Sequence, residues 1–223
     1  MLIVKDKNKA KFLIVLIEYV LIVLLAKFFV SNIKTDGVVE LAFLSFFLFF
    51  LTPLFTIRYI FREKTSDYFL CLNFIKKGIL KGILAIAVFV AVMWVLVVQL
   101  DWEKYMSVSK WILGDKDLMI FLEITAIPII VFAKEFFFRG FVLRSFAGVA
   151  GVAGAIVLQA MLVVLCAIYI GVFPGVRQAI LLFIPNLFLG YIAYVNRSVI
   201  ISSFLSWGYI LLIDLVFAYK LTQ

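Results

Sequence analysis

The feature that most constrains this chain is a series of apolar runs, each about as long as a membrane is thick. A transmembrane helix needs roughly 17 to 25 mostly apolar residues to cross about 30 Å of hydrocarbon. Seven runs meet this requirement: Phe12 to Val30, Leu41 to Phe61, Ile79 to Leu100, Leu118 to Phe138, Val149 to Tyr169, Ala179 to Val195 and Val199 to Tyr219. They predict an all-α fold, a polytopic membrane helical bundle of about seven transmembrane helices, with six or eight also possible.

Composition supports the same fold class. Of the 223 residues, 66% are hydrophobic and only 15% are charged, and a soluble domain of this length has too little interior to bury so much apolar surface. No repeat or long hydrophilic linker divides the chain, so residues 1–223 are predicted to form a single integral membrane domain. The first run follows a basic segment but is of spanning length and lacks a small-x-small cleavage site, which favours a retained signal anchor.

The distribution of Lys and Arg predicts the orientation, because short cytoplasmic loops retain these residues. One set of loops collects most of them: Lys5, Lys7, Lys9, Lys11, Arg58, Arg62, Lys64, Lys76, Lys77, Lys81, Arg139, Arg144 and Arg197. We therefore expect a cytoplasmic N-terminus and an outside C-terminus in a bacterial or archaeal plasma membrane. The net charge of +8 then fits a lipid bilayer with anionic headgroups, and no nucleic-acid partner is expected.

A charged stretch continues directly from the fourth apolar run: Lys134-Glu135-Phe136-Phe137-Phe138-Arg139-Gly140. Ionisable groups in a membrane segment are costly and mark either a functional site or a buried structural pair. Glu135 and Arg139 are four positions apart with the Glu first, which is the favourable orientation for an ion pair along a helix. Two compatible interpretations stay open: the pair fixes helix packing, or it lines a substrate or ligand cavity.

Lys134 adds a positive charge that a structural pair does not need. Its long side chain can extend to the membrane interface, or it can pair with an intramembrane acid among Glu18, Glu123 and Asp214, of which Asp214 is the first choice. Alternatively, Lys134 presents a cation to an anionic ligand such as a peptide carboxylate or a lipid headgroup. The ligand-binding candidates are Lys134, Glu135, Arg139, Ser206 and Asp214.

The charged stretch resembles the first motif of the CPBP family of intramembrane endopeptidases, which process CAAX proteins and bacteriocins. The family motif reads Glu-Glu-x-x-x-Arg-Gly with an aromatic residue before the Arg. Glu135, Arg139 and Gly140 match it, whereas Lys134 stands at the position of the first Glu. The resemblance covers about residues 118–215.

Two later segments are similar to the other motifs of the family, again with replaced side chains. The second motif, Phe-x-x-x-His, corresponds to a segment with Val163 at the Phe position and Ala167 at the His position. The third resembles residues 190–198, followed by Ser206 at a His position and Ile210 at an Asn position. Lys134, Ala167, Ser206 and Ile210 are thus degenerate motif positions.

The resemblance implies a mechanism in which the first Glu activates a water while His and Asn polarise the peptide carbonyl. A general base must accept a proton near neutral pH, and neither Ala167 nor Ile210 has a side chain that can stabilise an oxyanion. The chain has no His, the commonest metal ligand, so neither a metal nor another cofactor is expected.

These losses predict a catalytically inactive pseudoprotease that acts as a membrane scaffold or binds a peptide tail, a lipid or a partner helix. The alternative is an active CPBP-like endopeptidase for CAAX or leader-peptide substrates, with Glu135 as its base and Arg139 beside it. A third hypothesis is bacteriocin immunity or transport. Whether the chain is an enzyme therefore stays open at this point, and its partners are the bilayer and a membrane protein or hydrophobic peptide.

Overall fold

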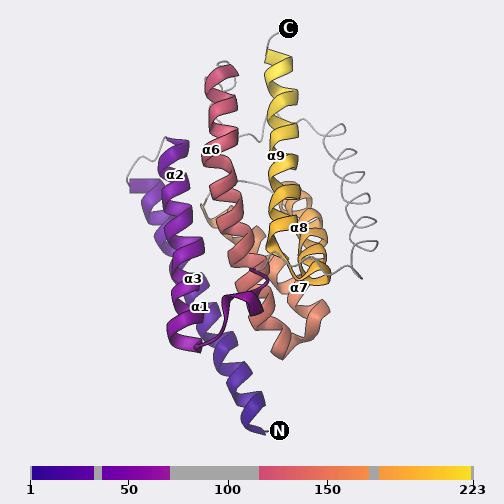
Figure 1. Ribbon diagram of the computed structural model, residues 1–223. Helices are drawn as coiled ribbons and strands as arrows, with labels where there is room; N and C mark the ends of the chain where they lie inside the picture. The colour runs from indigo at the N-terminus through magenta and orange to yellow at the C-terminus, as the bar shows by residue number, and fades with distance from the viewer. Residues whose placement is uncertain (1, 33–36, 71–115, 171–175, 222–223) are drawn as a thin grey trace.

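The computed structural model describes residues 2–32, 37–70, 116–170 and 176–221. In these ranges it is helical, without a strand, so the all-α fold class is confirmed (Figure 1). Its elements are α1 (Leu2–Asn32), α2 (Val38–Ser45), η1 (Phe46–Leu51), α3 (Thr52–Phe55), η2 (Thr56–Phe61), η3 (Thr65–Tyr68), α6 (Lys116–Glu135), η6 (Phe136–Val142), α7 (Leu143–Ile170), α8 (Val176–Asn196) and α9 (Val199–Leu221).

Three described helical stretches are long and apolar enough to cross a membrane: Lys7–Asn32, Val38–Phe61 and Asp117–Ile170. Two shorter apolar helices, Leu182–Asn196 and Val199–Leu211, follow them. α1 begins at one end of the bundle and α9 ends at the other (Figure 1), as an odd number of crossings requires. The predicted run Ile79 to Leu100 lies outside the described residues, so the count of seven stays a prediction.

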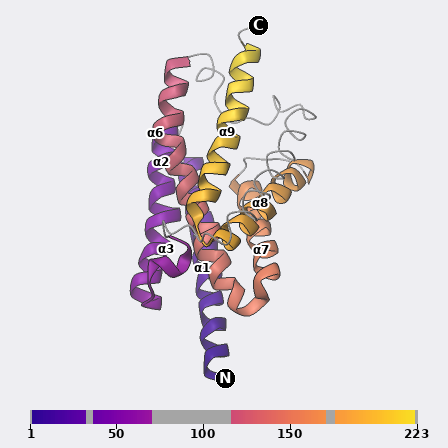
Figure 2. The same cartoon turned by 45° about the vertical axis from the view of Figure 1, so that its right-hand side comes forward.

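The longest stretch is a hairpin that turns back at Gly151. This residue has φ 71° and ψ 172°, a backbone region that glycine enters far more readily than other residues. α6, η6 and the start of α7 form one arm, and the rest of α7 forms the antiparallel arm (Figures 1 and 2). The predicted interruption between Phe138 and Val149 is therefore not observed, because the helix continues to the turn.

The helices pack in pairs around this hairpin. α7 contacts α1 and α8, whereas α6 contacts α2 and α9, and α8 contacts α9. Many of their outward side chains are apolar and exposed, including Leu13, Ile17, Phe121 and Ile124. An apolar exposed surface on a helical bundle is the arrangement expected of a protein surrounded by lipid, and the chain is an integral membrane protein.

Aromatic side chains fix the position of η6 in the core. Phe136, Phe137 and Phe141 are fully buried. The ring of Phe137 lies 5.4 Å from that of Phe49, and the ring of Phe141 lies 6.1 Å from that of Tyr68, measured between centroids. Rings of this size bury large apolar areas and prefer such tilted and edge-on arrangements. They hold the π-helical segment η6, and with it Arg139, in one place.

The segment after η2 covers the end of this aromatic core. A Cβ on Gly140 would lie 2.7 Å from the carbonyl oxygen of Tyr68, closer than real Cβ contacts allow. The next carbonyl, that of Phe69, accepts a hydrogen bond of 3.1 Å from the backbone N–H of Val199 at the start of α9. The glycine of the charged stretch is thus explained by close backbone packing, and the segment joins η6 to the α8–α9 turn.

Candidate functional site

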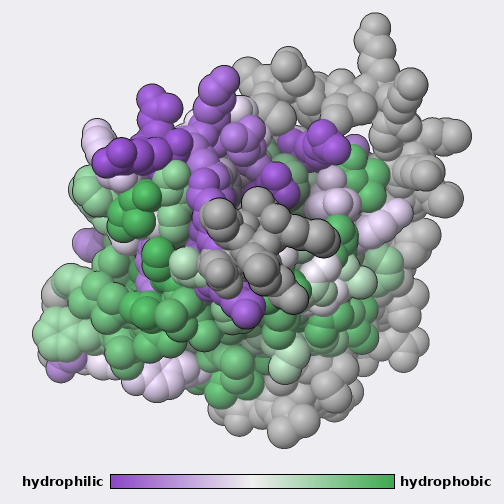
Figure 3. Space-filling model, turned by 90° about the horizontal axis from the view of Figure 1, so that it is seen from below, coloured by the Kyte–Doolittle hydropathy of each residue, from purple (hydrophilic) through white to green (hydrophobic). Residues whose placement is uncertain are grey.

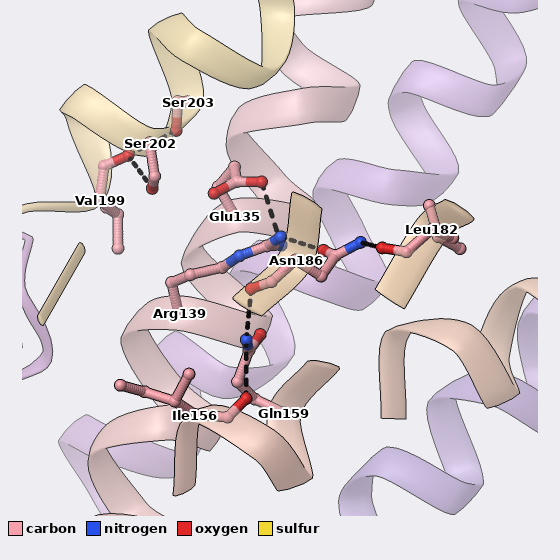
Figure 4. A network of polar contacts seen from close by, with 9 residues as sticks. All are labelled: Glu135, Arg139, Ile156, Gln159, Leu182, Asn186, Val199, Ser202 and Ser203. Atoms are coloured by element: carbon pink, nitrogen blue, oxygen red, sulfur yellow. Dashed lines mark hydrogen bonds and ion pairs between the residues drawn. The ribbon is translucent and has the colours of Figure 1, made fainter. Parts of the chain in front are cut away.

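The charged pair of the sequence is a buried ion pair at the junction of α6 and η6. Arg139 Nη1 lies 3.0 Å from Glu135 Oε1, and both side chains are 3% exposed (Figure 4). The loop position expected for Arg139 is therefore wrong, because Arg139 lies within η6. Its charge is offset inside the bundle by Glu135, so the helix continues where a loop was expected.

Two amides that the sequence reasoning missed extend this pair. Arg139 Nη2 donates a hydrogen bond to Asn186 Oδ1 on α8. The backbone carbonyl of Asn186 accepts a 2.8 Å hydrogen bond from Gln159 Nε2 on α7. Asn186 and Gln159 are 5% and 0% exposed, and each is a polar residue within an apolar run, which was the signal available in the sequence. The network connects η6, α7 and α8 through Asn186 (Figure 4).

The second oxygen of Glu135 has a different environment. Glu135 Oε2 is buried and has no hydrogen-bond partner of good geometry among the described residues. The hydroxyl groups of Ser202 and Ser206 on α9 lie near the carboxylate, and that of Ser202 donates to the backbone carbonyl of Val199. The site therefore contains one unsatisfied acceptor atom beside two hydroxyl groups.

Lys134 differs sharply from its neighbours in the charged stretch. Its side chain is exposed, whereas the residues on either side of it are buried. Among the described residues, no carboxylate lies within ion-pair distance of Lys134. Its side chain is close enough to Cys166 on α7 for the two groups to interact electrostatically.

The hairpin sets the relative depth of the motif positions on its two arms. Glu135 and Ala167 are equally far in sequence from Gly151, so the two arms bring them to comparable depth. Ala167 directly follows Cys166, which lies near Lys134. Ser206 approaches Glu135 from α9, and Ile210 is one turn further along the same helix. The structure thus brings Ser206 close to Glu135 and Cys166 close to Lys134.

Asp214 is an exception among the predicted ligand-binding residues. It is 2% exposed, and its side chain forms a hydrogen bond with that of Glu123 on α6. Glu123 precedes Lys134 by about three helical turns, or roughly 16 Å along the axis. Trp207 Nε1 also donates to the backbone carbonyl of Glu123 at 2.9 Å. Asp214 therefore belongs to a separate polar contact between α6 and α9 and does not pair with Lys134.

The donor set at the site does not fit a metal ion. Ala167 and Ile210 offer no ligand atom, and Arg139 occupies one oxygen of Glu135. Among the described residues, no group of three or more His, Cys, Asp or Glu side chains is arranged to hold a metal. The chemistry available to these side chains is limited to hydrogen bonding, charge and proton transfer at Glu135.

A family model matches part of the chain. Residues 116–213 match the model of the family described as type II CAAX prenyl endopeptidase Rce1-like. This part of the chain is similar to that family. The match confirms the resemblance to the CPBP family, and it spans the hairpin, α8 and the part of α9 that holds Ser206 and Ile210. Comparison with the curated proteins and with the solved structures found no match.

Proposed function

We propose that this Rce1-like membrane protein is a catalytically inactive pseudoprotease that binds an anionic tail, such as a peptide carboxylate or a lipid headgroup, through Lys134. The observation that carries the proposal is the contrast between Lys134 and Glu135. The exposed residue at the position of the family's first Glu is a cation, and the adjacent Glu is buried and engaged by Arg139.

The neighbourhood of Lys134 supports binding rather than bond cleavage. A general base has to reach a water beside the scissile carbonyl, and Lys134 stands where the resemblance places the Glu that activates this water. Ala167 and Ile210 supply no donor for an oxyanion. An unpaired ammonium near hydrocarbon is stabilised by an anion, which favours a ligand that ends in a negative charge.

One observation favours the alternative of an active endopeptidase. Glu135 Oε2 has no hydrogen-bond partner among the described residues, so one oxygen of the carboxylate can still accept a proton. Ser202 and Ser206 lie beside it and could donate hydrogen bonds. In this alternative Glu135 is the base and Arg139 orients it.

Purified protein incubated with a prenylated CAAX peptide and with a leader peptide tests between the two. We expect no cleavage of either substrate by the wild type. Turnover that is lost in Glu135→Gln but kept in Lys134→Gln would instead establish the active alternative.

A hydrophobic peptide with a free C-terminal carboxylate, compared with the same peptide amidated, tests the binding part. We expect the wild type to prefer the carboxylate by about tenfold, since a hydrogen bond to a charged group contributes about 1.5 to 3 kcal/mol. Lys134→Gln should remove this preference, and Lys134→Glu should reverse it. Equal affinity of the wild type for both peptides would exclude Lys134 as a carboxylate site.

A further inference from the structure

A polar pocket lies at the end of the bundle where α1 begins, among residues that the proposed function does not use. Its volume is about 260 Å³, and its walls include Lys11, Glu63, Asp67, Tyr68, Arg144 and Ser145. These residues come from α1, from the segment around η3, and from the part of α7 before the Gly151 turn. Figure 3 views this end of the molecule and shows hydrophilic side chains gathered on it.

Three of the lining side chains already satisfy one another. Lys11 forms an ion pair with Glu63 Oε1, and the hydroxyl of Tyr68 donates to Glu63 Oε2 at 2.7 Å. Burial raises the pKa of Glu63, but the hydrogen bonds from Lys11 and Tyr68 together lower the pKa below its usual value. Glu63 therefore stays ionised and neutralises Lys11, which leaves the binding capacity of the pocket to its other residues.

Arg144 and Ser145 have unused hydrogen-bonding capacity. Arg144 is exposed and donates through Nε to the backbone carbonyl of Asp67 at 3.1 Å. Among the described residues, its terminal nitrogens have no hydrogen bond or ion pair. Ser145 is 6% exposed, and its Oγ is buried without a partner of hydrogen-bond geometry. That hydroxyl lies near the hydroxyl of Tyr68. The Tyr68 hydroxyl already donates a hydrogen bond to Glu63.

The surroundings of the pocket have the character of a membrane interface. Four exposed cations are close in sequence to its lining residues: Lys7, Lys9, Arg62 and Lys64. Exposed apolar residues begin immediately beside them, with Leu13 on α1 and Val149 on α7 at 56% and 45% exposure. Asp67 is the remaining carboxylate and is exposed, so solvent screens its charge. Cations beside exposed apolar side chains are the arrangement expected where lipid headgroups meet acyl chains.

We propose that this pocket binds a phosphate group, carried by the headgroup of an anionic phospholipid or by a phosphate ion in solution. The planar guanidinium of Arg144 presents two parallel N–H groups, which suit two oxygens of one phosphate. The hydroxyl of Ser145 donates a further hydrogen bond and thereby gains the partner that a buried polar group requires. The site is distinct from the Glu135–Arg139 pair, which does not line it.

Thermal unfolding of the full chain in a phosphate-free maltoside detergent tests the site. One series has the detergent alone, a second has added phosphatidylglycerol, and a third has inorganic phosphate in the buffer. We expect phosphatidylglycerol to raise Tm. Arg144→Gln should weaken the apparent affinity about tenfold, the loss of one hydrogen bond to a charged group.

Two further variants separate the site from general charge. Lys9→Gln removes an exposed cation that does not line the pocket, and it should keep most of the effect of phosphatidylglycerol. Ser145→Ala keeps every charge and should weaken the affinity severalfold. An equal Tm increase with inorganic phosphate would identify a phosphate ion as the ligand, whereas an effect of the lipid alone would identify the headgroup. The same loss in Arg144→Gln and Lys9→Gln, or no response to either probe, would overturn the proposal.

Discussion

The guanidinium of Arg139 donates to the side-chain oxygen of Asn186, a residue 47 positions later in the chain. This contact connects the π-helical segment η6 to α8 and completes the environment of the buried ion pair. A donor that is buried without its acceptor costs about 1 to 3 kcal/mol. The stability of the bundle should therefore depend on Asn186 as well as on Glu135.

Asn186→Leu should lower the free energy of unfolding by about 1 to 3 kcal/mol, because it leaves Nη2 of Arg139 without an acceptor. Asn196→Leu is the matched control. Both Asn residues are buried on α8 and donate to the carbonyl four residues earlier, at 2.6 Å and 2.9 Å, but only Asn186 accepts from Arg139. Thermal unfolding in detergent measures both variants, and equal losses would show that the contact with Arg139 adds nothing.

The ion pair itself gives a second prediction. Glu135→Ala and Arg139→Ala should each destabilise the protein by about 3 to 5 kcal/mol, because each leaves an uncompensated buried charge. Glu135→Leu combined with Arg139→Met removes both charges with little change in volume and should be milder than either single change. The yield and Tm of purified protein are the measurements. Single variants as stable as the wild type would mean that water reaches the pair.

The third prediction concerns close backbone packing. Gly140→Ala places a methyl group against the carbonyl oxygen of Tyr68, and such overpacking costs about 1 to 3 kcal/mol. Gly208 on α9 is a helical glycine, and no atom lies within 4 Å of the position that a Cβ would take there. Gly208→Ala should therefore be neutral or stabilise by about 0.5 to 1 kcal/mol. Equal changes in Tm for Gly140→Ala and Gly208→Ala would contradict the packing argument.

Glu63 gives a prediction on pH. Its pKa in the folded protein is lowered from an ordinary value of 4.5, because the hydrogen bonds from Lys11 and Tyr68 outweigh the effect of burial. A carboxyl whose pKa is depressed by folding adds stability above its unfolded pKa and loses it as the pH falls through the folded pKa. Tm should therefore decrease below about pH 4.5 more steeply in the wild type than in Glu63→Gln. An equal decrease of Tm with pH in the wild type and in Glu63→Gln would show that Glu63 does not contribute to the pH dependence of stability.

Topology is the fifth prediction, and it follows from the Lys and Arg distribution. A reporter fused after Gln223 should lie outside the cell, and a reporter inserted near Lys76 should lie in the cytoplasm. The placement of the ends of α1 and α9 at opposite ends of the bundle agrees with an odd number of crossings. Both reporters on the same side would rule out the seven-helix arrangement.

The sequence predicted the helical fold because the length and apolar character of a membrane helix are local properties. The ion pair between Glu135 and Arg139 was also predictable, because it depends on a local spacing of four residues. The positions of the charged residues were predicted less reliably than the helices. Arg139 resembles a loop residue when its charge is considered alone, and only the contact with Asn186 and the pair with Glu135 explain why it is buried. Partners that are distant in sequence, such as Asn186 and Gln159, leave no local pattern beyond an amide in an apolar run.

Asp214 shows the same limit of prediction from sequence, because its contact is also with a residue distant in the chain. As an intramembrane acid, Asp214 was the first choice of partner for Lys134, but the depth of a residue in the bundle depends on where its helix starts and on which neighbour it faces. The hydrogen bond between Asp214 and Glu123 is about three turns away from Lys134. Helical periodicity predicts the face of a residue, whereas its height relative to another helix requires the tertiary structure.

The turn at Gly151 makes chain length a requirement of this site. Because the two arms of the hairpin bring Lys134 close to Cys166, each residue between them acts as a spacer. One inserted residue on either side of Gly151 would shift one arm by about 1.5 Å and rotate it by about 100° relative to the other. Substitutions in this segment can therefore be frequent among related chains, whereas insertions and deletions should be rare.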